Sequence, residues 1–185
     1  MSAFLRRAQA GFTLVELLIV VIILTVLAAI IVPQFSSATL DAREATLDSN
    51  LARVRSAIEL YQAQHNGTYP GANQSTGASC PSSGTAGTGA ANSAQALMDQ
   101  LTMFSNASGQ TCSTSDTANF RFGPYLRRGF PAESVTDSTA ISMQTVAGTV
   151  APEGTTGGWR YSPLTGQIIM NSTATDSRGR AYSTH

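Results

Sequence analysis

The sequence predicts an α+β fold in which a long N-terminal helix packs on a small C-terminal antiparallel sheet. Three observations predict this fold. No charged residue occurs between Leu17 and Leu40, an amphipathic pattern follows, and short alternating apolar segments occur in the last third of the chain. A helix needs roughly 20 apolar residues to span a bilayer. The helix therefore has a membrane half and an amphipathic half.

The apolar segment has two ordinary interpretations. Arg6 and Arg7 precede it, as in a cleaved secretory signal, but the apolar run is longer than the usual core of about 7–15 residues. A single-pass anchor would keep the Arg pair in the cytoplasm and place the C-terminal part outside. Neither interpretation explains Glu16 at the start of the run, because a carboxylate in lipid costs free energy. No basic residue lies within the run to pair with it.

The segment GFTLVE, residues 11–16, resembles the processing motif of type IV pilins and type II secretion pseudopilins. The resemblance implies that residues 1–11 are a leader, which a prepilin peptidase removes by cutting between Gly11 and Phe12. The new N-terminal Phe12 would then be N-methylated. The resemblance also implies the ladle shape of that family and a single-pass protein of the bacterial inner membrane. Its C-terminal part would be periplasmic or extracellular, and it would enter a filament after assembly.

The resemblance gives Glu16 a partner, which is the amino group of Phe12 in an adjacent subunit. Two charges that are each costly in lipid attract one another strongly at low dielectric. The pair would also fix the register between subunits. Pro33 is the second assembly residue, because proline removes a backbone donor and kinks or loosens a helix. It is equally compatible with a simple boundary at the end of the membrane span.

Residues 12–40 are thus predicted as the transmembrane and assembly helix, and residues 41–66 as its amphipathic half. One apolar face is formed by Leu47, Leu51, Val54, Ile58 and Tyr61. Arg55 and Glu59 are spaced for an i,i+4 ion pair. Gly67 and Pro70 predict where the helix stops.

Residues 67–118 are predicted as a loop-rich insert with one short helix at residues 94–104. Cys80 and Cys112 flank that helix. Outside the cytoplasm they would form a disulfide, and otherwise they are two free thiols. Their spacing does not suggest a metal site.

Residues 119–185 are predicted as the C-terminal antiparallel sheet region, with a hairpin in GGWRYSPLTGQIIMNST. The first part of this hairpin, GGWRYSPLTGQI, resembles pieces of major-pseudopilin-like proteins, as do HNGTYP and GPYLRRGFP. Many of those proteins bind calcium through acids in C-terminal loops. After Glu153 this chain has a single acid, Asp176, so calcium is implied only by the resemblance, and the sequence itself predicts no cofactor.

The composition directs the functional interpretation to a structural role. The formal net charge is zero, which argues against nucleic acid as a direct partner, and no catalytic constellation occurs, so the protein is not predicted to be an enzyme. The leading hypothesis is a major-pseudopilin-like subunit of a type II secretion pseudopilus. The alternatives are a subunit of a surface type IV pilus for adhesion, motility or DNA uptake, and a monomeric membrane-anchored binding domain.

The resemblance also implies a set of partners. The subunit would form a helical homo-polymer with itself. It would meet the prepilin peptidase and methyltransferase, an inner-membrane assembly platform with its ATPase, and minor pilins or pseudopilins.

Overall fold

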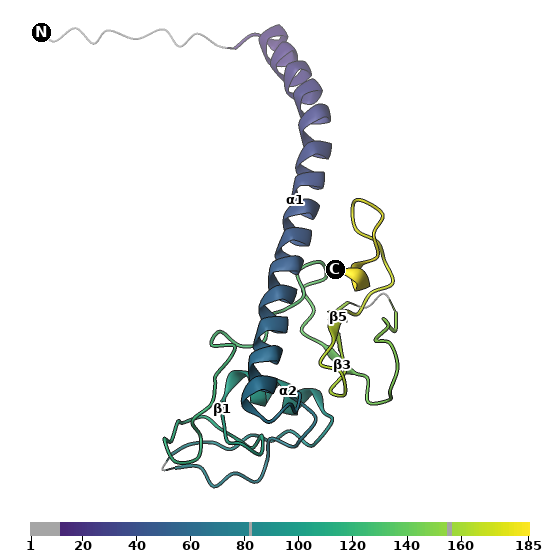
Figure 1. The fold of residues 1–185 in the computed structure, drawn as a ribbon. Helices are drawn as coiled ribbons and strands as arrows, with labels where there is room; N and C mark the ends of the chain where they lie inside the picture. Colours follow the sequence, from purple (N-terminus) through teal and green to yellow (C-terminus); the bar gives the residue numbers. More distant parts are fainter. Residues whose placement is uncertain (1–11, 82, 155–156) are drawn as a thin grey trace, which may run out of the picture. The chain divides into compact units, whose positions relative to one another are not determined.

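The computed structural model describes residues 12–81, 83–154 and 157–185. Helix α1 covers Leu14–Gln64 (Figure 1). The chain divides into two compact units, one ending at Thr39 and the other running from Leu40 to His185. We call the second unit the head. The predicted leader, residues 1–11, lies outside the described residues.

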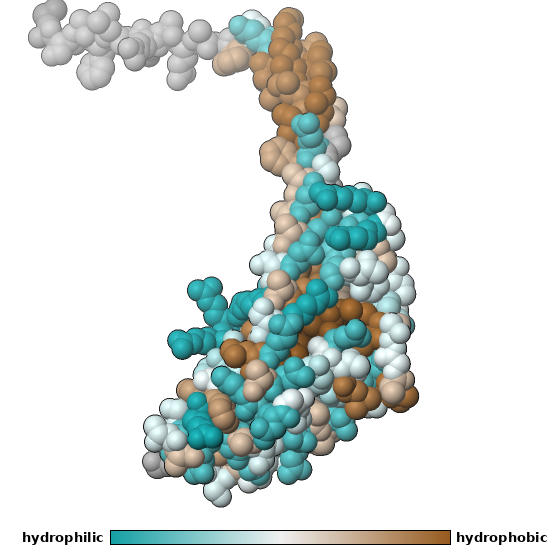
Figure 2. Space-filling view, in the orientation of Figure 1, coloured by the Kyte–Doolittle hydropathy of each residue, from teal (hydrophilic) through white to brown (hydrophobic). Residues whose placement is uncertain are grey.

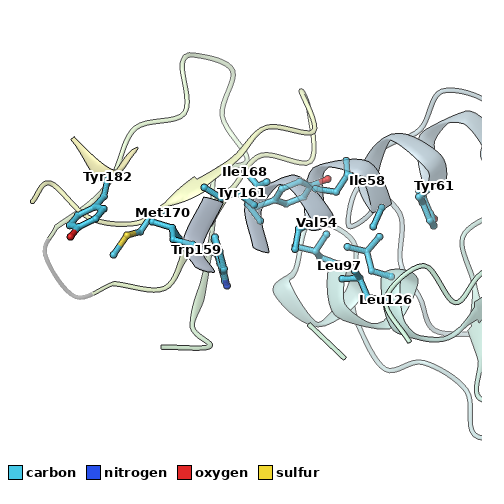
Figure 3. Packing of buried hydrophobic residues seen from close by; sticks show 14 residues of the cluster. Val54, Ile58, Tyr61, Leu97, Leu126, Trp159, Tyr161, Ile168, Met170 and Tyr182 are labelled. Carbon is cyan, nitrogen blue, oxygen red and sulfur yellow. The ribbon is translucent and has the colours of Figure 1, made fainter. Parts of the chain in front are cut away.

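The predicted apolar stripe of α1 is confirmed as one wall of the core. All five stripe side chains are at most 2% exposed. They meet side chains from α2 (Ala94–Thr102), β4 (Trp159–Tyr161) and β5 (Ile168–Met170) in one cluster (Figure 3). The largest members of that cluster are Trp159, Tyr61 and Tyr161. The stripe therefore holds the sheet and the insert to the same face of the helix.

The α+β class is confirmed, and the sheet is mixed. Strands β4 and β5 form the expected antiparallel hairpin, in which Arg160 faces Ile169. Strand β3 (Ile141–Met143) pairs with β4 in parallel, so the wholly antiparallel prediction is wrong for this strand. Parallel neighbours need a crossover of a dozen or more residues, and residues 144–158 supply one. Alternation of apolar residues indicates a strand but not its direction.

The insert is held by polar contacts and one covalent link. Its two short strands, β1 (Phe104–Ser105) and β2 (Thr111–Cys112), are antiparallel, and a disulfide joins Cys80 to Cys112 with the Cα atoms 5.7 Å apart. The buried carboxylate of Asp99 accepts hydrogen bonds from Ser75 Oγ at 2.6 Å and from the Thr88 amide at 2.9 Å. A segment with few apolar residues thus gains order from hydrogen bonds to one buried acid.

The end of the chain is tied to α1 through Glu44. Its carboxylate accepts hydrogen bonds from the Ser177 amide at 2.8 Å and from the Tyr182 hydroxyl at 3.0 Å. Tyr182 begins the short 3₁₀ helix η1 (Tyr182–Thr184). This contact joins residues more than a hundred positions apart, and sequence periodicity gives no sign of it.

The predicted i,i+4 pair between Arg55 and Glu59 is wrong. Arg55 Nη2 instead donates to two backbone carbonyls, Ile168 O at 3.1 Å and His185 O at 2.8 Å. Both carbonyls belong to segments that fold back onto α1 from the end of the chain. Because Arg55 turns toward them, no ion pair within the described residues uses the Glu59 carboxylate.

We expect the substitution Leu51→Ala to lower the free energy of unfolding by about 2–5 kcal/mol, because it removes a fully buried side chain and leaves a cavity. Leu60→Ala is the matched control, since Leu60 is 50% exposed on the same helix. The fluorescence of Trp159, the single tryptophan, reports unfolding of the detergent-solubilised chain by denaturant. Equal losses for the two variants would contradict the assignment of the stripe to the core.

His65 makes the stability of the head depend on pH. Its ring stacks on Tyr61 with centroids 3.7 Å apart, and its nitrogens lie 2.8 Å from Tyr61 O and 3.1 Å from Ser105 Oγ. Burial lowers the pKa of His65. The unfolded chain therefore takes up the proton first as the pH falls, so this contribution to stability is complete well above pH ~6.5 and is lost below it.

We expect the free energy of unfolding to fall between pH 7 and pH 5, and to fall less steeply in the variant His65→Phe. Phenylalanine keeps a ring against Tyr61 but cannot be protonated. Denaturant titrations of both proteins at each pH measure how the free energy of unfolding changes with pH. Titratable groups that the two proteins share contribute equally to both, so the difference between the proteins reports His65 alone. Identical slopes would show that His65 is not a source of the dependence.

Candidate assembly site

The first part of α1 is an apolar surface that no other described segment of the chain covers. The segment Leu14–Ile31 has a mean hydropathy of 3.2 and is long and apolar enough to cross a membrane, and none of it is buried. Figure 2 shows this part of the helix as a nearly unbroken apolar surface. Water is a poor solvent for such a surface, so lipid or other apolar helices must cover it.

Glu16 closes the start of this helix. The Thr13 amide and the Thr13 hydroxyl donate to Glu16 Oε2 at 2.9 and 2.8 Å, and the Glu16 amide donates back to Thr13 Oγ1 at 3.3 Å. This is a capping box, in which the residue before the helix and the third helical residue satisfy one another's amides. Thr13 is therefore the N-cap residue, which is why the helix begins at Leu14 and not at the predicted Phe12.

The capping box leaves Glu16 able to take a second partner. Both bonds from Thr13 reach Oε2, and no hydrogen bond within the described residues uses Oε1. The carboxylate is exposed, so a cation from outside the chain can approach that oxygen. The sequence contains the signal for this motif, which is Thr-x-x-Glu before an apolar run. Helical periodicity alone does not reveal it.

The other predicted assembly residues are described only in part. Phe12 is 81% exposed, whereas Gly11 lies outside the described residues, so the cleavage position stays a prediction. Helix α1 is continuous through Pro33, whose side chain is not described. The predicted kink or loosening at this proline also stays a prediction.

A family model described as "Prokaryotic N-terminal methylation motif" matches residues 6–32 of the chain. The match covers the basic start, Glu16 and the apolar segment of α1. The start of the chain thus carries the N-terminal methylation motif, by which it resembles type IV pilins and pseudopilins. Its apolar N-terminal helix fits a single-pass, membrane-anchored member of that family.

Curated relatives of this pilin-like chain come from both branches of the family. The type II secretion system core protein G of Pseudomonas aeruginosa is 38% identical over 69 residues, which cover 37% of this chain and 48% of the relative. The major component of the type IV narrow pilus of Thermus thermophilus is 46% identical over 57 residues, covering 31% and 49%. The type IV major fimbrial protein of Dichelobacter nodosus is 40% identical over 55 residues, covering 30% and 35%.

These matches are partial. The aligned residues span about half the length of the first of these relatives, and no solved structure matches the chain. The likeness therefore does not extend over the whole protein, and similarity by itself does not assign the role of this protein.

Several acids of the head, such as Glu44, Asp99 and Asp176, are used for folding. Within the described residues, no group of three or more histidine, cysteine, aspartate or glutamate side chains is placed to hold a metal ion. Asp176 is surrounded by donors, namely the amides of Arg178 and Arg180 at 2.9 and 2.7 Å and the His185 ring at 3.2 Å. These donors hold the pKa of Asp176 below its usual range, against the opposing effect of desolvation. The calcium that the family resemblance implied gains no support from this arrangement.

We expect Thr13→Val to weaken the start of α1 by about 1 kcal/mol, because valine keeps the shape of threonine but cannot cap the helix. Amide hydrogen exchange at residues 14–17 of the purified protein in detergent measures the opening of the first turn. Thr13→Ser, which keeps the hydroxyl, should exchange like the parent. Equal exchange in all three proteins would mean that the capping box does not stabilise the helix.

Proposed function

We propose that this chain is a structural subunit of a type IV filament-like assembly, as a major-pseudopilin-like component of a type II secretion pseudopilus. It begins as a single-pass protein of the bacterial inner membrane. A prepilin peptidase removes residues 1–11 and the new Phe12 is N-methylated. An ATPase-driven platform then moves the subunit from the bilayer into a helical polymer of copies of itself.

One observation carries this proposal: the methylation motif leads directly into an apolar helical segment that no described part of the chain covers. A cleaved signal would be discarded, and a plain anchor would need no carboxylate at its start. In a filament the same surface packs against the equivalent helices of neighbouring subunits. Such contacts are heterologous, so they propagate and do not close.

Glu16 supplies the register of this polymer. Its Oε2 stays with Thr13, and its Oε1 accepts the Phe12 ammonium of the adjacent subunit. The approach of that ammonium removes the cost of an unpaired charge in an apolar interface. The capping box thus holds the carboxylate in place before the partner arrives.

The secretion role and the surface pilus role differ in what the filament does. Relatives named for each role match similar shares of this chain. The secretion role is preferred because several of the curated relatives carry the name core protein G. The surface pilus role is the alternative, and deletion of the gene distinguishes the two roles.

We expect Glu16→Gln to abolish filament assembly while sparing membrane insertion and processing. Glutamine keeps an oxygen that can accept from Thr13, so the helix start is preserved and only the charge is lost. Filaments are measured by sedimentation of sheared fibres and electron microscopy, and insertion by membrane fractionation, in cells that carry the assembly machinery. Filaments at the parental level would rule out the charge pair.

Deletion of the gene separates the two roles. In a secretion system, extracellular enzymes should accumulate in the periplasm while surface fibres are unchanged. Loss of surface fibres with normal secretion would assign the chain to a pilus. A deletion with neither effect, together with the absence of filaments of the parent protein, would favour a monomeric membrane-anchored domain.

A further inference from the structure

Glu59 is an exposed acid that has no partner among the residues that the structure describes. Its helical neighbour Arg55 is held by the carbonyls of Ile168 and His185, and no hydrogen bond or ion pair within the described residues uses the Glu59 carboxylate. Most other acids of the head are engaged; Glu44 and Asp176, for example, accept several hydrogen bonds each. The Glu59 carboxylate is therefore available to a cation from outside the chain.

Glu59 lies on the rim of an open groove of about 710 Å³ beside α1. We call it the Glu59 groove; its lining also includes Gln62, Tyr69, Thr149, Gln167 and Ile168. The side-chain amides of Gln62 and Gln167 have no hydrogen-bond partner within the described residues. The Tyr69 ring is fixed against Gly166, where a Cβ atom would come within 2.3 Å of it.

The chemistry of the Glu59 groove suits a guanidinium group. A carboxylate can take two parallel N–H bonds from arginine, amide oxygens can accept further ones, and an aromatic ring can stack on the planar cation. Arg55 also lines the groove, but its Nη2 atom is already committed to two carbonyls. Glu59 is the one acidic residue in the lining of this groove.

A pair of arginines without partners lies elsewhere on the head. Arg127 and Arg128 are both exposed, and they form a turn closed by a bond from the Gly129 amide to Leu126 O at 3.2 Å. Leu126 is buried and its amide bonds Leu101 O at 2.8 Å, which fixes the base of the turn. Within the described residues neither arginine side chain makes a hydrogen bond or an ion pair.

The arginine turn and the Glu59 groove lie on opposite flanks of α1. The segment that follows the turn contacts the helix at Asn50, whose Nδ2 lies 3.3 Å from Ala132 O. Asn50 and Glu59 are nine residues apart, which is about 180° around a helix of 3.6 residues per turn. Tyr125, just before the turn, bonds Gln64 at 2.7 Å, so the turn and Glu59 both lie near the end of α1.

We propose that the Arg127–Arg128 turn of one subunit docks in the Glu59 groove of the next copy of this chain. Two complementary surfaces on opposite flanks at a similar height form a heterologous contact, which repeats from copy to copy. The contact rests on the proposed filament and adds a specific interface between heads to the packing of the apolar helices. It also gives partners to the Glu59 carboxylate and to the two arginines, which have none among the described residues.

A charge swap tests the contact in cells that carry the assembly machinery. Glu59→Arg should lower the yield of sedimentable filaments about tenfold, because like charges then face one another across the interface. Arg127→Glu combined with Arg128→Glu should do the same. The swapped protein with all three substitutions should recover most of the parental yield. Arg53→Glu is the control, because Arg53 is exposed on α1 and its side chain makes no hydrogen bond or ion pair within the described residues. This variant should keep the parental yield.

The outcomes separate this contact from the proposed function. If the parent protein forms filaments but the swapped protein does not recover their yield, the contact is overturned. It is also overturned if the charge reversals do not lower the yield. Either result leaves the filament role intact. Failure of the parent protein to form filaments overturns both. A swapped protein that assembles where each reversal fails supports the contact, since each reversal is then compatible with folding.

Cysteine crosslinking gives a second readout that does not depend on filament yield. Subunits carrying Glu59→Cys are co-expressed with subunits carrying Arg128→Cys, and both keep the native Cys80–Cys112 disulfide. Oxidation of the assembled filaments should give a covalent dimer, and the same mixture carrying Glu16→Gln should give none. Filaments that assemble without any crosslink would overturn the contact.

Discussion

The burial of one face of α1 is the interaction on which the rest of the head depends. Five apolar side chains of that face are almost fully enclosed, and the sheet, the insert and η1 are otherwise too small to fold alone. The three sheet strands are three residues each, far below what an isolated sheet needs. The other elements are thus ordered because they pack on this helix. Polar contacts such as those of Asp99 and Glu44 then fix their positions.

The same helix serves two environments along its length. From Leu14 to Ile31 it is exposed and apolar, whereas from Leu47 to Tyr61 only one face is apolar and the rest meets water. Glu16 lies at the first turn of the apolar segment, at the opposite end of the helix from the amphipathic part. Its Oε2 atom accepts hydrogen bonds from Thr13 and caps the helix. Its Oε1 atom has no partner within the described residues and can accept a hydrogen bond from another molecule. One carboxylate can therefore cap its own helix and also contact a neighbouring subunit.

Much of the fold was predictable because it depends on local patterns. Helical periodicity identified α1 and its buried face, and the alternation around Trp159 and Ile168 identified the hairpin. The direction of β3 was not predictable, since a strand has the same alternation whichever way it runs. The pair expected between Arg55 and Glu59 also failed, because two carbonyls from the end of the chain compete for the same guanidinium at close range.

The sequence by itself determined the apolar helix, its acid and the N-terminal methylation motif, because these features are contiguous and need no partner to be recognised. Only the tertiary structure decided which charged side chains have a partner within the described part of the chain and which do not. That division depends on segments that meet across more than a hundred residues, as Glu44 meets Ser177. Glu59 and the arginine turn stand out as free only after those contacts are known.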